Sequence, residues 1–178
     1  MISLSYIDKL QRANADDLAF YPLTTLETAL TSGHIIYCLE NNEPAGYLWF
    51  GSVRAGYDVT IYQACIDYEL RRHHLGQGMV AELVGLATAG GATGIRLKCA
   101  SSAASNLFWQ SIGFICTAVT DGGVKRKRKI NHYRTNVTPG LFAVDYVEPS
   151  SKAADMRSYN KAKREGIIMP SRFSRSHY

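Results

Sequence analysis

The sequence lacks several features that would assign it to a membrane, a secreted or a metal-binding class. It contains no apolar run of the roughly 18 residues that a membrane-spanning helix needs, and its first residues do not show a basic segment followed by an apolar one. No CxxC pair is present, and the four cysteines lie in apolar, strand-like runs: Cys38, Cys65, Cys99 and Cys116. We therefore expect a cytoplasmic protein with buried, reduced cysteines, no metal site and no membrane partner.

Positive charge is scarce in the first two thirds of the chain. Residues 1–120 carry seven Lys/Arg and ten Asp/Glu, whereas residues 121–178 carry thirteen and five, within a net charge of +5. A mildly acidic body is thus followed by a strongly basic third. This asymmetry predicts an anionic partner for the late part of the chain.

The hydrophobic periodicity predicts one domain over 1–148 and a basic tail over 149–178 that is mobile or peripherally docked. The chain has 178 residues and 46% apolar content, which suits a single core. Helices are expected at 4–14, 23–32, 76–89 and 103–114. Strands are expected at 34–40, 45–54, 58–67, 94–100, 114–120 and 130–137. This order predicts an α/β or α+β fold around one mixed sheet.

The strand expected at 58–67 has side chains on two faces. Strict alternation predicts one face made of Val59, Ile61, Gln63 and Cys65, and the opposite face made of Thr60, Tyr62, Ala64 and Ile66.

The junction "ACIDYELRRHHLGQGMVAELVG" (64–85) joins this strand to the next helix. The first amides of a helix lack intrahelical partners, and the helix dipole places partial positive charge there. Arg71 and Arg72 add full charges, and Gly76 permits close approach of a ligand to the backbone. The junction therefore predicts a site for a phosphate or diphosphate, with an ordinary helix start and solvated arginines as the alternative.

Two segments, "CIDYELRRHHLGQGMVAEL" and "IRLKCASSAASNLFWQSIGF", resemble the GNAT acyltransferase superfamily over roughly residues 34–137. In that family an Arg/Gln-x-x-Gly-x-Gly/Ala segment follows a strand. Arg71 takes the first place of that segment, His74 the place of the first glycine and Gly76 that of the last. A second register, with His73 first and Gly76 and Gly78 on the glycines, fits the spacing from the strand end less well.

The resemblance implies a GNAT-like, mostly antiparallel sheet flanked by helices, whose strands 58–67 and 94–100 splay apart around acetyl-CoA. It implies an N-acetyltransferase that moves an acetyl group to an amine of unidentified identity. The implied coenzyme A contacts are the charges of Arg71 and Arg72, the loop and helix start at His73, His74, Leu75, Gly76 and Gln77, the strand backbone at Ala64 and Ile66, and Asn106, which alternatively caps local backbone.

The catalytic groups depart from the family pattern. The usual carboxylate on the long strand is absent, and Phe108-Trp109 stands where many relatives have a Phe-Tyr pair. Tyr62, Trp109 and Tyr133 are candidates for catalysis, with His132 beside them, and a structural role is the alternative for each. Amides near Cys65 and Ile66 are expected to polarise the thioester carbonyl. A catalytically inactive GNAT-like module that binds nucleic acid or a protein is the alternative function.

The basic run Lys125, Arg126, Lys127, Arg128 and Lys129 leads into the last strand. It allows three interpretations: a solvated hairpin tip, a clamp for the 3′-phosphate of coenzyme A, or a track for nucleic acid. The acceptor pocket is expected between the early helices and residues 121–134. A homodimer formed through the last strand and tail is a further expectation.

Overall fold

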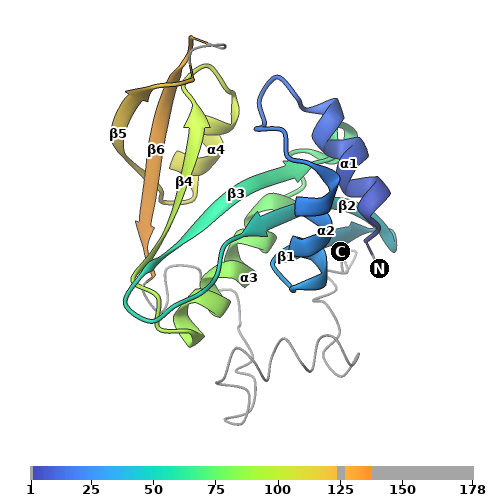
Figure 1. The fold of residues 1–178 in the computed structure, drawn as a ribbon, viewed down its shortest axis with the longest axis horizontal. Helices are drawn as coiled ribbons and strands as arrows, with labels where there is room; N and C mark the ends of the chain where they lie inside the picture. Colours follow the sequence, from blue (N-terminus) through green and yellow to red (C-terminus); the bar gives the residue numbers. More distant parts are fainter. Residues whose placement is uncertain (1, 124–126, 138–178) are drawn as a thin grey trace, which may run out of the picture.

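A computed structural model describes residues 2–123 and 127–137 of the chain. Its elements follow in the order α1 (Leu4–Ala13), α2 (Leu23–Thr31), β1 (Ile35–Glu40), β2 (Glu43–Phe50), β3 (Asp58–Ile66), a 3₁₀ turn η1 (Tyr68–Leu70), α3 (Leu75–Ala89), β4 (Gly94–Ala100), α4 (Ser105–Ser111), β5 (Ile115–Asp121) and β6 (Lys129–Asn136). The expected order of helices and strands is confirmed (Figure 1). The expected tail at 149–178, and Lys125 and Arg126 of the basic run, lie outside the described residues.

The six strands form one mixed sheet in the order β1-β2-β3-β4-β6-β5. Every neighbouring pair is antiparallel except β3 and β4, which are parallel. The parallel pair needs a crossover, and α3 supplies it between the two strands. The predicted α/β fold with a mixed, mostly antiparallel sheet is therefore confirmed.

Helices cover the two faces of the sheet unequally. On one face, α3 and α4 pack on Leu48, Ile61, Leu97, Tyr133 and neighbouring apolar side chains from β1 to β4 and β6. On the other face, α1 and α2 pack on a smaller cluster that includes Tyr47, Trp49 and Cys65. This second layer covers β1 to β3 only, so no helix of the described residues covers β4, β6 and β5 on that side (Figure 1).

A β-bulge in β3 overturns the predicted sharing of faces along this strand. Trp49 of β2 pairs with Gln63, and the next residue, Phe50, pairs with Ile61, so Tyr62 is an additional residue in β3. An extra residue reverses the alternation beyond it. Val59 and Ile61 consequently pack toward α3, whereas Gln63 and Cys65 face α1 and α2, and Ala64 and Ile66 join the α3 side.

The parallel pairing of β3 and β4 is short. It runs from Asp58 opposite Gly94 to Ile61 opposite Leu97 and then stops, although both strands continue. Beyond that point the strands diverge, as Figure 1 shows. The predicted splaying of these two strands is therefore confirmed.

The cysteines are all free, but the prediction that all four are buried was wrong. Cys38 and Cys65 are buried, Cys99 is half-buried and Cys116 is exposed. Cys116 belongs to β5, an edge strand with every residue exposed, so strand-like periodicity there does not lead to a core position. Within the described residues, no helix is long and apolar enough to cross a membrane.

Candidate functional site

The loop between β3 and α3 reaches the helix through two residues in left-handed backbone conformation. Arg72 has φ of 67° and His74 has φ of 59°. His74 is the residue before α3, and no side chain caps the helix there. The amides of Leu75, Gly76 and Gln77 therefore have no partner inside the helix. The left-handed angle at His74 is one that glycine adopts most easily, which fits the register that places His74 on the usual first glycine.

Gly76 lies where α3 approaches α4. A Cβ atom at this position would be 3.2 Å from Cζ of Phe108 and 3.9 Å from Cγ1 of Ile66. This is close packing, and it means that any side chain at Gly76 pushes on the Phe108 ring. The glycine thus keeps the start of α3 close to both β3 and α4.

The charged residues of the loop are tied to neighbouring elements. Nη2 of Arg71 donates to Oδ1 of Asn14, at the end of α1, over 2.5 Å. The guanidinium of Arg71 also lies 5.0 Å from the ring centre of Tyr68. Nδ1 of His73 lies 3.9 Å from Oε1 of Glu40. These contacts hold the loop in place while the side chains stay at the surface.

Among the described residues, the edge of β3 that faces β4 has no strand partner beyond Ile61. The amide of Asp67 donates to Ala45 of β2 over 2.9 Å. Backbone groups of an antiparallel strand point alternately to its two sides, so those of Ile66 and Ala64 point away from β2 and toward the diverging β4. Of the amides expected to polarise a carbonyl, that of Ile66 is directed toward this gap and that of Cys65 is not.

Two of the catalytic candidates are packed in the core. Trp109 is buried and makes edge-to-face contacts with Phe108 and Phe114. Tyr133 is 1% exposed, and its hydroxyl donates to Oδ1 of Asn106 over 3.0 Å and accepts from Nε2 of Gln110 over 3.2 Å. Burial and these bonds are what a structural role requires, and a catalytic role for either residue stays a prediction.

Asn106 has its side-chain amide engaged on both sides. Its Nδ2 donates to the carbonyl oxygens of Ala100 and Ala103 over 2.8 and 2.6 Å. Its Oδ1 accepts from Tyr133 and from Nδ2 of Asn131. Asn106 thus caps backbone at the end of β4, and its contact with coenzyme A stays a prediction.

Tyr62 sits on the bulge of β3. It is 45% exposed, and its ring lies against Trp49 with 4.7 Å between the ring centres. His132, on β6, is within 2.8 Å of the Thr120 hydroxyl through Nε2. Among the described residues no carboxylate forms an ion pair with His132, and the catalytic roles of Tyr62 and His132 stay predictions.

Gln63, which the sequence did not single out, anchors the loop between α1 and α2 on the bulge. It is 2% exposed, and its Nε2 donates to Oε1 of Gln11 over 2.9 Å and to the carbonyl of Ala19 over 2.5 Å. Its Oε1 accepts from the hydroxyl of Tyr47. Gln11 is itself fixed by the amide and carbonyl of Tyr21. These partners are distant in sequence, so no local pattern could have revealed the network.

The α1–α2 loop also meets the hairpin loop between β5 and β6. Nη1 of Arg128 donates to the carbonyl of Asp16 over 2.7 Å. Lys129 pairs with Asp121 over 2.6 Å at the base of the hairpin. The described part of the basic run therefore lies at a hairpin end, as one interpretation expected, and makes contacts within the chain. Its role toward coenzyme A or nucleic acid stays a prediction, as does a homodimer.

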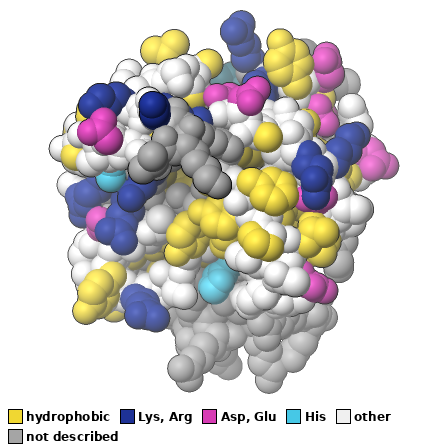
Figure 2. All heavy atoms as spheres, turned by 45° about the horizontal axis from the view of Figure 1, so that its top comes forward, with side chains coloured by type: hydrophobic (Ala, Val, Ile, Leu, Met, Phe, Trp, Pro, Cys, Tyr) yellow, Lys and Arg dark blue, Asp and Glu magenta, His cyan; other side chains and the backbone are white. Residues whose placement is uncertain are grey.

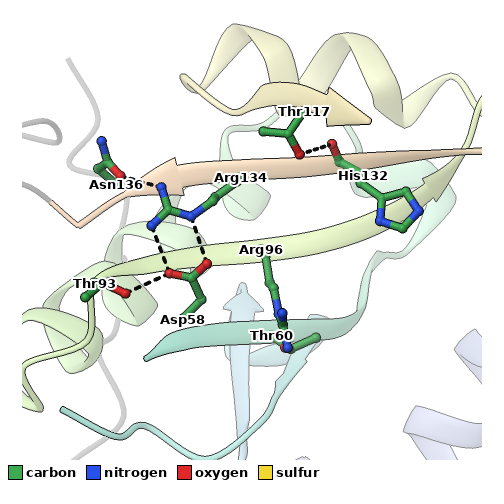
Figure 3. Close-up of polar contacts among 8 residues, drawn as sticks. All are labelled: Asp58, Thr60, Thr93, Arg96, Thr117, His132, Arg134 and Asn136. Atoms are coloured by element: carbon green, nitrogen blue, oxygen red, sulfur yellow. Dashed lines mark hydrogen bonds and ion pairs between the residues drawn. The ribbon is translucent and has the colours of Figure 1, made fainter. Parts of the chain in front are cut away.

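An ion pair closes the other end of the splayed strands, where β3, β4 and β6 lie together (Figure 3). Arg134 donates through Nε and Nη2 to the two carboxylate oxygens of Asp58 over 2.8 and 3.0 Å. The Thr93 hydroxyl adds a bond to Asp58. The bonds from Arg134 are the main cause that lowers the pKa of Asp58 below its ordinary value. This pair holds β3 and β6 together across β4.

The family model described as "Acetyltransferase (GNAT) family" matches residues 4–114, which is more than half of the chain. No curated protein sequence matches the chain. Within the described residues, no three His, Cys, Asp or Glu side chains come together as a metal site would require.

Solved structures with this fold include Ard1 from Thermoplasma volcanium, with a TM-score of 0.66 and 13% identity, covering 76% of this chain and 91% of that one. The ribosomal-protein-S18-alanine N-acetyltransferase from Escherichia coli has a TM-score of 0.59 and 15% identity, with 82% and 93% covered. The aminoglycoside 6′-N-acetyltransferase from Enterococcus faecium has a TM-score of 0.62 and 10% identity, with 76% and 91% covered. At these identities the likeness concerns the fold.

Proposed function

The chain belongs to the GNAT acetyltransferase family and is an acyl-CoA N-acyltransferase that uses acetyl-CoA. We propose that it binds this co-substrate between the diverging ends of β3 and β4 and acetylates an amine there. The observation that supports this most is the uncapped start of α3 beside the unpaired edge of β3. The start of α3 suits a diphosphate, and the edge of β3 suits the amides of a pantetheine arm.

The diphosphate is expected at the amides of His73, His74, Leu75, Gly76 and Gln77. These amides lie in a loop and first helical turn where the helix dipole is positive. The left-handed backbone at His74 turns the loop so that the free amides of α3 follow directly. Arg71 and Arg72 add long-range attraction for phosphate from the same loop.

The pantetheine arm and the thioester are expected along β3. Ala64 and Ile66 direct their backbone groups into the gap, where they can pair with an extended, amide-bearing ligand as another strand would. As the amine attacks, negative charge develops on the thioester oxygen, and the amide of Ile66 is positioned to donate to it. The bulge at Tyr62 sets this direction, because it determines which amides of β3 face the gap.

Asp17 is the carboxylate that we propose as the guide for the acceptor's ammonium group. It lies in the α1–α2 loop, which Gln63 anchors over the bulge. The thiols of Cys65 on β3 and Cys99 on β4 have raised pKa values, chiefly because of burial, and the charge of Asp17 contributes to both. The loop that carries Asp17 is bonded to β3 through Gln63 and Ala19 and to the β5–β6 hairpin through Arg128 and Asp16, so it borders the gap between β3 and β4. The ammonium must lose a proton before its nitrogen can attack the thioester, and a water relay to solvent can take this proton without a strong base on β3.

The experiment compares Gly76→Glu with Gly76→Gln by calorimetric titration of acetyl-CoA. Both side chains meet Phe108 in the same way, so their difference isolates the negative charge at the helix start. We expect Gly76→Glu to bind at least about tenfold more weakly than Gly76→Gln, since like charges at about 4 Å in a partly solvated site repel by about 1 to 4 kcal/mol. Equal affinities of the two variants would place the diphosphate elsewhere.

A further inference from the structure

The uncovered part of the sheet carries a row of basic side chains from two neighbouring strands. Leu97 and Tyr133 belong to the core against α3 and α4, so the side chains that alternate with them, Arg96 and Lys98 on β4 and His132 and Arg134 on β6, point to the opposite side. That side is covered by α1 and α2 only over β1 to β3. Arg96 and Lys98 are exposed accordingly.

Two arginines of this row stand directly opposite each other. Arg96 stands directly opposite Arg134, and Lys98 stands directly opposite His132. Like charges in directly opposed positions destabilise a sheet. Asp58 forms an ion pair with Arg134, and the charge of Arg96 also helps to lower the pKa of Asp58 (Figure 3). Arg96 donates its hydrogen bond to the neutral hydroxyl of Thr60. Neither Arg96 nor Lys98 forms an ion pair with a carboxylate of the described residues.

This basic face borders the place where the thioester is expected. Lys98 is one residue beyond Leu97, the last residue of β4 that pairs with β3, so it lies where the gap begins. The contact between Arg128 and Asp16 joins the two loops at the open end of the gap. In Figure 2, which brings this end forward, Lys and Arg side chains gather on the left, where β4, β5 and β6 lie, beside hydrophobic side chains in the middle.

We propose that the acceptor is an amine that carries an anionic group, a carboxylate or a phosphate, and that Arg96 and Lys98 bind this group while the amine faces the thioester. The inference rests on the proposed acetyl transfer and assigns its substrate class. Charge complementarity selects this occupant: an exposed arginine and lysine without carboxylate partners attract an anion and repel a polycationic amine. Asp17, on the loop opposite, suits the ammonium end of the same molecule.

The first experiment measures free thiol release with amine pairs that differ in the anionic group: glycine against glycinamide, and phosphoethanolamine against ethanolamine. The comparison is made within each acceptor between wild type and Lys98→Gln, so differences in amine basicity cancel. We expect Lys98→Gln to lower kcat/KM for the anionic acceptors by about tenfold or more, since a hydrogen bond to a charged group is lost. The neutral acceptors should change less than about twofold.

The matched control is Lys9→Gln, which removes the same charge from an exposed position on α1. This variant should leave kcat/KM unchanged for both acceptors of each pair. An equal effect of Lys98→Gln on anionic and neutral acceptors would overturn the proposal. Preferred acetylation of spermidine, increased by Lys98→Gln, would also overturn it.

A second measurement decides the proposal even if none of these amines is acetylated. Inorganic phosphate is titrated into the protein saturated with coenzyme A, and amide chemical shifts are followed. We expect shifts centred on Arg96, Lys98 and His132 that vanish in Lys98→Gln. The absence of shifts on this face would overturn the proposal. If the protein does not bind coenzyme A, the proposed function fails, but the same titration without coenzyme A still tests the anion site.

Discussion

Gln63→Glu would introduce a carboxylate into β3, the strand on which the family usually carries one. The change adds no volume, but it exchanges a donor for an acceptor in a site that is 2% exposed. Nε2 of Gln63 now donates to Oε1 of Gln11 and to the carbonyl of Ala19. Gln11 cannot turn its amide to compensate, because Tyr21 holds both ends of it.

The cost follows from these contacts. Oε1 of Gln11 and the carbonyl of Ala19 lose this donor and face a carboxylate oxygen, although Oε1 of Gln11 keeps the amide of Tyr21 and the bond from the Tyr47 hydroxyl is kept. The carboxylate oxygen that replaces Nε2 is buried without a donor, which costs about 1 to 3 kcal/mol or more for a charged group, so we expect the variant to lose about 3 kcal/mol of unfolding free energy at pH 8. For a domain of this size that loss lowers Tm by about 10 °C.

The loss should depend on pH in a defined direction. The buried, negatively surrounded carboxyl at position 63 has a folded pKa above its unfolded value of about 4.3. Between these two values the folded state binds more protons than the unfolded state, so the free energy of unfolding falls as pH rises. The gap between wild type and variant is therefore smallest near pH 4 and grows toward neutral pH.

Urea unfolding of both proteins between pH 4 and pH 8 measures this gap. Gln77→Glu is the matched control, because it makes the same change at an exposed position in the first turn of α3 and should alter the unfolding free energy by less than about 0.5 kcal/mol. A Gln63→Glu variant as stable as wild type at pH 8, or one with faster acetyl transfer, would refute the structural role of Gln63.

Two further changes test other parts of the structure. Asp58→Asn removes the ion pair with Arg134 that lowers the pKa of Asp58, and we expect a loss of about 1 kcal/mol at pH 7. Because the folded pKa is lowered, this contribution should begin to decrease near the unfolded pKa of about 4 and be lost as pH falls through the lower folded pKa, and a loss independent of pH would contradict it. In thiol labelling at pH 8, exposed Cys116 should react first. Cys38 and Cys65 are buried with pKa values of about 12 and should react only on unfolding, so fast labelling of either would contradict the buried positions.

The sequence was sufficient for the order of elements and for the junction. Apolar periodicity marked the helices and strands, and the two arginines before α3 and Gly76 in its first turn predict an anion site. The splaying of β3 from β4 came from the family resemblance rather than from the residues themselves.

The bulge, the hydrogen bonds of Gln63 and the open basic face depend on tertiary contacts, which the sequence alone does not show. The strict period of two assigned to 58–67 missed the bulge at Tyr62, because the additional residue is defined by its pairing with β2. The sequence placed Gln63 on the same face as Val59 and Ile61. Its partners at Gln11 and Ala19 are set by the folding of a distant loop. The open basic face required knowledge of how far α1 and α2 extend over the sheet.

Binding of coenzyme A at the start of α3 is the claim on which the rest depends, and an amide-resolved NMR titration with coenzyme A tests it most directly. The largest shifts are expected at residues 73–77 and at Ala64 and Ile66 on the edge of β3. Saturable binding that leaves these amides unshifted and moves another surface instead would contradict the claim.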